Sequence, residues 1–241
     1  PSFVVKLDSS GNFVWARSVN SNSSSTWWGG PHLAVDSDAN VYAAKSQISA
    51  DFDAGEETYS ANDAHDDAFV WKLDSSGNLL WAKKASGSFG IDVGSIAADP
   101  SGNVYTTGTF KGTADFDPGE DTYNLESHTS ESSGSNNADA FVWKLDPSGN
   151  LVWVKNIAYG DTYGGLAVQS MTLDGSGNAY TTGHFSDTND FDPGEGVTNL
   201  TSPSSVSMFG SFALFVSKLN SAGDLVWARS AGSLGINSGE S

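Results

Sequence analysis

The sequence predicts an all-β protein built as an array of four-stranded antiparallel sheets, because two phrases return along the chain. The first, FVVKLDSSGNFVWAR at residues 3–17, returns at residues 69–83, 141–155 and 215–229. The second starts at residues 33, 96 and 171 and alternates with the first. Repetition at a long period indicates units that bury their apolar faces by stacking on copies of themselves. The 241 residues are therefore expected to form one repeat domain.

Each phrase is expected to form a β-hairpin. In the first phrase the β-rich runs FVWKL and LLWA flank the turn sequence DSSGN, and in the second DPSGN precedes VYTTGTF. Asp opens such a turn through its side chain and Gly takes the left-handed conformation, which predicts a type I turn closed by a G1 bulge. Equivalent lysines lie 66, 72 and 74 residues apart, a period that suits four strands: Lys6, Lys72, Lys144 and Lys218.

One four-stranded pattern used for every sheet is typical of the blades of a β-propeller. The combination AVDSxGNVYxTGxF, DFDPGxxT and DAFVxKLDxxGNxxWA resembles the bacterial β-propeller repeat called SBBP, over almost the whole chain. This resemblance implies a propeller fold and an extracellular or cell-surface location, and it implies no catalytic residues. By analogy with such blades, the second phrase supplies the two inner strands and the first phrase the two outer strands.

The hairpin order divides the domain unevenly. We expect the outer hairpin of an incomplete blade at residues 1–30, blade repeats at residues 31–93 and 94–165, and a third repeat with the start of the next linker at residues 166–241. The chain then contains four outer hairpins but only three inner hairpins. A lone hairpin is marginal in water and leaves a strand edge open. Either an adjoining segment of a longer chain or a second copy is expected to complete it.

The first hairpin carries apolar residues at the positions that complete blades use for burial. We predict that these residues form an assembly surface covered by the strands of a neighbour: Phe3, Val5, Leu7 and Trp15. The two ends of the array differ, so the contact is heterologous, and it propagates into a filament unless its rotation closes a ring.

The charge is strongly negative. Eleven basic residues against 29 acidic ones give a net charge of −18, which argues against nucleic acids and anionic membranes as partners. Eight of the eleven cations recur at two positions of the first phrase, and we interpret them as structural, with their stems packed between blades. No run approaches the roughly 20 apolar residues that span a bilayer, so membrane insertion is not expected. Adaptation to salt would produce the same acidity.

The acidic loops at residues 51–56, 115–120 and 190–195 are the candidate metal sites. Carboxylates at positions 1, 3 and 6 of each loop, with a Gly that permits a bend, supply the oxygen ligands that calcium requires. The predicted Ca²⁺ ligands are Asp51, Asp53, Glu56, Asp115, Asp117, Glu120, Asp190, Asp192 and Glu195. The alternative is a tight turn in which Asp accepts backbone N–H bonds while Phe52, Phe116 or Phe191 anchors the loop.

Catalysis finds little support in the sequence. The four histidines fall at non-equivalent repeat positions, and no nucleophile lies in a recognisable elbow motif. Trp27 and Trp28 stand together in a Ser-rich connection, so they are candidates for stacking on a sugar or covering a subunit. The alternative is that they fold back over the rim of the propeller.

These observations lead to three hypotheses. The first is a non-catalytic extracellular structural protein, stabilised by calcium, that polymerises or belongs to a larger surface protein or filament. Its partners are copies of itself or adjoining segments of a longer chain. The second is a carbohydrate-binding adhesin module with glycan partners, and the third is a secreted polysaccharide hydrolase or lyase. The sequence leaves open the number of blades in a complete ring.

Overall fold

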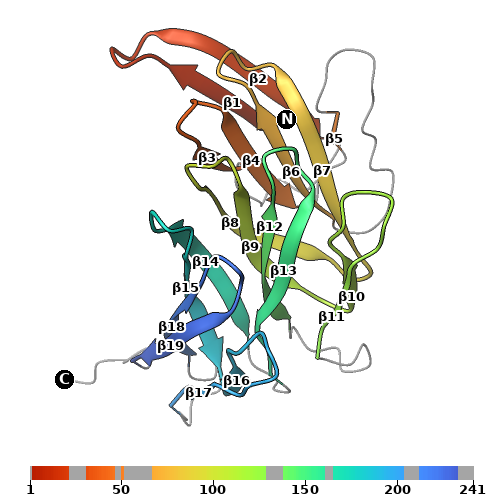
Figure 1. Ribbon diagram of the computed structural model, residues 1–241, viewed down its shortest axis with the longest axis vertical. Coiled ribbons are helices and arrows are strands. Elements are labelled where there is room, and N and C mark those ends of the chain that lie inside the picture. The colour runs from red at the N-terminus through yellow and green to blue at the C-terminus, as the bar shows by residue number, and fades with distance from the viewer. Residues whose placement is uncertain are drawn as a thin grey trace, which may run out of the picture.

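The computed structural model describes residues 2–21, 31–46, 50–51, 67–128, 138–160, 165–203 and 212–232. Every regular element in these ranges is a β-strand, and all paired strands run antiparallel, so the all-β prediction is confirmed. Figure 1 shows the strands gathered into successive sheets from the N-terminus to the C-terminus.

The strands form one hairpin and three sheets. The N-terminal hairpin consists of β1 (Ser2–Leu7) and β2 (Phe13–Ser21). The first sheet contains β3 (His32–Val35), β4 (Val41–Ser46), β6 (Ala68–Leu73) and β7 (Leu79–Gly87). The second sheet contains β8 (Ile91–Ala98), β9 (Val104–Phe110), β12 (Asp139–Leu145) and β13 (Leu151–Ala158). The third sheet contains β14 (Leu166–Leu173), β15 (Ala179–Ser186), β18 (Phe212–Leu219) and β19 (Leu225–Ala231).

Each sheet is the four-stranded meander that a propeller-like array requires. β3 contacts β8, and β8 contacts β14, so the first strand of each sheet lies on the side where neighbouring sheets approach. That is the inner position expected for the second phrase. Short strands lie at the other side. β5 (Ala50–Asp51) pairs with β2, and β10 (Thr113–Asp115) with β11 (Asn124–Glu126) extends the first sheet, whereas β16 (Thr188–Asp190) and β17 (Asn199–Thr201) form a separate two-stranded sheet.

The turns of both phrases share one hydrogen-bond pattern, shown well by Asp74. Its Oδ1 accepts hydrogen bonds from the amides of Ser76 and Asn78, both at 2.8 Å, and its Oδ2 accepts one from the Asn78 side chain. Gly77 closes the turn at a φ of 85°, and the ladder shifts register between Lys72 and Leu73, as a bulge requires. The same side-chain pattern begins at Asp8, Asp36, Asp99, Asp146 and Asp174.

The core lies between successive sheets, because each outer hairpin has two different apolar faces. On β6, Phe69, Trp71 and Leu73 pack with Val4 and Trp15 of the N-terminal hairpin. Val70, which points the other way, packs in a cluster with residues of β12 in the second sheet. We call the first side the phenylalanine face and the second the valine face; the valine face of one unit packs against the phenylalanine face of the next.

Candidate functional site

The repeated polar side chains of the valine face form a seam with the next unit. Lys72 Nζ and Trp81 Nε1 both donate hydrogen bonds to the Pro147 carbonyl, at 3.4 and 3.0 Å. The carbonyl belongs to the outer turn of the second sheet. The same arrangement joins Lys6 and Trp15 to the Ser75 carbonyl, and Lys144 and Trp153 to the Ser221 carbonyl. The structure therefore contains one directional interface three times.

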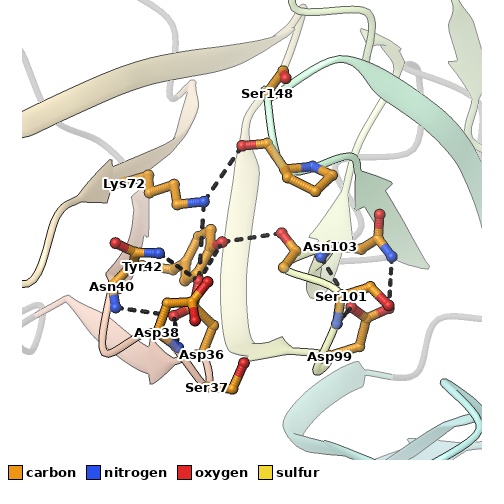
Figure 2. A network of polar contacts seen from close by, with 12 residues as sticks. Asp36, Ser37, Asp38, Asn40, Tyr42, Lys72, Asp99, Ser101, Asn103 and Ser148 are labelled. Carbon is orange, nitrogen blue, oxygen red and sulfur yellow. Dashed lines mark hydrogen bonds and ion pairs between the residues drawn. The ribbon is translucent and has the colours of Figure 1, made fainter.

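A tyrosine makes the corresponding contact between inner hairpins. The Tyr42 hydroxyl donates to the Gly102 carbonyl at 3.0 Å and lies 3.1 Å from Asp36 Oδ2, as Figure 2 shows for the labelled Tyr42 and Asp36. The Tyr105 hydroxyl likewise donates to the Gly177 carbonyl. Burial, and then the charge of Asp99, raise the pKa of Tyr105 to about 12. These hydroxyls therefore keep the proton that they donate.

The buried lysines are held by several partners at once. Lys72 Nζ lies 4.8 Å from the centre of the Tyr42 ring and 3.9 Å from Asp36 Oδ2 (Figure 2). Burial acts to raise the pKa of Asp36, but hydrogen bonds from the side chain and amide of Asn40 and from the Asp38 amide keep it below the usual range. A buried ammonium is tolerated only where such partners replace water. The interpretation of the repeated lysines as structural is therefore confirmed at this position.

The acidic loops are closed by their own carboxylates. Asp115 Oδ1 accepts hydrogen bonds from the amides of Asp117 and Tyr123, at 3.0 and 2.9 Å, and Asp117 Oδ1 accepts one from Gly119. Asp190 and Asp192 repeat this pattern in the third loop. Phe116 and Phe191 are fully buried below them. The geometry is that of the tight turn, the alternative to a metal site.

The acidic segments also reach across to the preceding unit. β10 pairs with β7, with Asp115 opposite Ser86, so the β10–β11 hairpin extends the first sheet. Asp190 exchanges two backbone hydrogen bonds with Tyr159, which follows β13 of the second sheet. β5 pairs with β2 in the same manner. Each segment thus covers the last strand of the unit before it, which protects an otherwise open edge.

Calcium binding by these loops stays a prediction. Across the described ranges, no group of three or more His, Asp or Glu side chains is gathered in a way that could hold a metal ion. Glu120 and Glu195 are exposed at the loop surface. Asp53 and Glu56 lie outside the described residues, and the side chain of Asp51 is not described.

The predicted assembly surface needs one correction. Trp15 is only 6% exposed, because its ring packs on Gly77 and its indole N–H donates to the Ser75 carbonyl of the same chain. It belongs to the valine face, which the first sheet covers. Phe3, Val5 and Leu7 lie on the opposite face of the hairpin and are exposed. Trp27 and Trp28, the predicted sugar or subunit contacts, lie outside the described residues.

A buried carboxylate at the start of β12 was not predicted. Asp139 is fully buried, and its Oδ2 accepts hydrogen bonds from the backbone amide of His128 at 2.9 Å and from the side chain of Asn156 at 2.7 Å. His128 Nδ1 lies 2.9 Å from the same oxygen. Burial raises the pKa of Asp139. The ring of His128 stacks on Tyr159 at a centroid distance of 3.8 Å, so the cluster connects to the acidic segment beside Tyr159.

In the first sheet a lysine, instead of a histidine, lies beside the equivalent buried carboxylate. Asp67 precedes β6 as Asp139 precedes Phe141 on β12, and its Oδ2 lies 3.2 Å from Lys84 Nζ. The sequence signal for these buried carboxylates is the Asp-Ala pair that directly precedes both FVWKL runs. The recurrence of Tyr42, Tyr105 and Tyr180 at one position was a similar signal for the tyrosine contacts. Their partners lie 60 or more residues away, so the sequence did not identify them.

One comparison with known proteins agrees with a propeller-type repeat, the match to a WD repeat-containing protein. No protein-family model matches the chain. It is 28% identical over 174 residues to an uncharacterised WD repeat-containing protein of Acanthamoeba polyphaga mimivirus; the match covers 70% of this chain but only 12% of that protein. A solved structure of a protein of unknown function from Bacteroides caccae matches with a TM-score of 0.27 and 10% identity, over 92% of this chain and 87% of that one. In the part of the chain that is described, no helix is long and apolar enough to cross a membrane.

Proposed function

We propose that the protein is a non-catalytic structural protein whose blades stack into part of an extracellular array, surface protein or filament. One observation carries this proposal: the polar side chains that recur in the sequence donate to the backbone of the neighbouring unit. Lys72, Trp81 and Tyr42 all act in this way between the first and second sheets. The repeated chemistry of the chain thus serves contact between units.

Such a stack suits a structural role for a physical reason. Its stability is approximately a sum of the stabilities of the units and of their nearest-neighbour interfaces, so units can be added without redesign. The direction of every seam is the same, from the valine face of one unit to the turn of the next. The extracellular location is supported by the resemblance to SBBP repeats.

The carbohydrate-binding adhesin remains the second candidate, favoured by the adjacent Trp27 and Trp28 in a connection rich in Ser. Aromatic side chains offer large flat surfaces with a polar edge, which suit contact with sugars. A glycan array with the full chain and with Trp27→Ala/Trp28→Ala tests this candidate. Binding that the double substitution abolishes would favour the adhesin over the structural protein.

Incubation with a panel of polysaccharides tests the structural proposal against the hydrolase or lyase. We expect no new reducing ends and no unsaturated products from the full chain. Turnover that disappears when one carboxylate is replaced, with the fold retained by circular dichroism, would contradict the proposal. The assay does not depend on self-association, so it addresses the function separately from the contact proposed below.

A further inference from the structure

The two outer surfaces of the stack are the two halves of the interface that occurs inside it. On the N-terminal hairpin the phenylalanine face is open: Phe3 is 69% exposed, whereas its equivalent Phe69 is 2% exposed. On the third sheet the valine face is open: Val216 is 40% exposed, whereas its equivalent Val142 is fully buried. Leu214 beside Val216 and Val5 beside Phe3 extend the two apolar surfaces.

The third sheet also holds the polar donors of the seam in place. Lys218 Nζ lies 4.7 Å from the centre of the Tyr180 ring, and Lys144 Nζ lies 4.8 Å from that of Tyr105. Lys218 Nζ also lies 3.5 Å from Asp174 Oδ2. Trp227 occupies the position of Trp153 and packs against Tyr180. Among the described residues, no turn of a further unit accepts the hydrogen bonds of Lys218 and Trp227.

The N-terminal hairpin holds the matching acceptor. Its turn has the hydrogen-bond pattern of the other turns, from Asp8 to Asn12. A Cβ placed on Gly77 or Gly149 would come within 2.8 Å of a side chain from the preceding unit, Trp15 or Lys83. A Cβ on the equivalent Gly11 would meet nothing within 4 Å in the described part of the chain. The surface that receives the Trp and Lys side chains elsewhere is therefore free here.

We propose, on the basis of the structural function above, that the third sheet of one copy binds the N-terminal hairpin of a second copy. Lys218 and Trp227 donate to the Ser9 carbonyl, the equivalent of the Ser75 carbonyl. Arg17 Nε donates to the Gly77 carbonyl at 2.7 Å inside the chain, and Arg229 makes the same contact with the Gly11 carbonyl of the second copy. Val216 and Leu214 pack against the face of Phe3 and Val5.

The occupant is a second copy because every feature of the free surfaces continues an interface already present three times. The contact is heterologous, since the surface on one copy differs from the surface on the other. The third sheet of the second copy can bind the hairpin of a third copy in the same way. Copies therefore add head to tail.

Two variants test the contact from its opposite sides. Gly11→Ala places a methyl group where the ring of Trp227 is expected. Alanine is strained at the φ of 83° that Gly11 takes, but Ala39, at a φ of 61° in the equivalent place of another turn, shows that a turn of this kind can hold an alanine. Trp227→Ala removes the donor and the packing surface on the other side. Each variant is expected to associate at least tenfold more weakly than the wild type in sedimentation equilibrium, while it keeps the β-sheet circular dichroism spectrum and a cooperative thermal transition in dilute solution.

Mixing the variants gives the sharpest outcome. Gly11→Ala keeps an intact third sheet and Trp227→Ala keeps an intact hairpin, so the mixture should form a one-to-one complex that grows no further. Assemblies of the wild type that neither substitution weakens would overturn the contact and leave the structural function in place. A wild type that is monomeric at all concentrations would also overturn the contact, and the polysaccharide assay would then decide the function independently.

Discussion

The second and third sheets carry the same phrase, yet only the second is covered on both faces. Phe141 and Val142 of β12 are both fully buried, while on β18 Phe215 is buried and Val216 is exposed. The residue types are nearly the same, so the neighbour decides which positions become core. The comparison teaches that each repeat encodes a unit with two complementary faces, and that a face is completed only by contact with the next unit.

The largest expected effect comes from one substitution made at equivalent covered and open positions. Phe141→Ala removes a fully buried ring from the second sheet and should lower the free energy of unfolding by about 3–5 kcal/mol. Phe3→Ala, at the same position of the N-terminal hairpin, should change it by less than about 0.5 kcal/mol in dilute solution. Urea unfolding followed by tryptophan fluorescence measures both. Equal losses would mean that the open face is covered.

The next prediction concerns calcium binding by the acidic segments, which lie against β7 and the end of β13. If calcium binds them, a concentration 100-fold above the Kd adds about 2.7 kcal/mol to the free energy of unfolding. Addition of EDTA should then lower the melting temperature of the wild type. Asp115→Asn keeps an oxygen for the amides of Asp117 and Tyr123 but removes the charge, so it should weaken this response. An unchanged melting temperature of the wild type in EDTA would show that calcium does not stabilise these segments.

Much of the fold followed from the sequence because its rules are local. The alternation in FVWKL placed the strands, and the Asp, Gly and Asn of each turn placed the hairpins. Trp15 was misplaced because its partners, Ser75 and Gly77, lie 60 or more residues away and no local pattern indicates the side of the hairpin on which the next unit packs. The pairing of Asp115 with β7 of the preceding sheet depends equally on tertiary register.

A smaller effect on stability is expected from the indole N–H groups of the seam, of which one makes a hydrogen bond inside the chain and its equivalent on the third sheet, within the described residues, does not. Trp81→Phe removes the N–H that donates to the Pro147 carbonyl and keeps an aromatic ring, so it should cost about 1 kcal/mol of stability. The matched control, Trp227→Phe, should cost close to nothing in dilute solution, since within the described residues its indole N–H makes no hydrogen bond. Thermal unfolding of both variants at low protein concentration makes the comparison. A loss of the same size for Trp227→Phe would place a partner on the third sheet.

The smallest effect is a pair of opposite pH dependences. Hydrogen bonds to its turn lower the pKa of Asp146 despite partial burial, so its contribution to stability is present above about pH 4 and is lost as the pH falls through the folded-state pKa. Burial raises the pKa of Asp139, so its contribution is largest below about pH 4 and is lost as the pH rises through the folded-state pKa.

Melting temperatures of Asp146→Asn and Asp139→Asn between pH 2 and 7 separate these two contributions. Relative to the wild type, Asp146→Asn should lose stability as the pH rises toward 4, and Asp139→Asn should gain stability as the pH rises above 4. Asp67→Asn in the first sheet offers the control, because Asp67 lies 3.2 Å from Lys84 where Asp139 has His128. Parallel profiles for both variants would show that the two carboxyl groups do not differ in this way.

Hydroxyl-radical footprinting of the full chain at two protein concentrations tests the central claim most directly, because it reads the covered and open faces in one experiment. In dilute solution, Phe3 and Leu7 should be oxidised rapidly while Phe69 and Phe141 are protected. At high concentration, Phe3 and Trp227 should become protected together, because the N-terminal hairpin of one copy and the third sheet of another cover each other. Equal oxidation of Phe3 and Phe69 in dilute solution, or protection of Phe3 without Trp227 at high concentration, would contradict the account of two complementary faces.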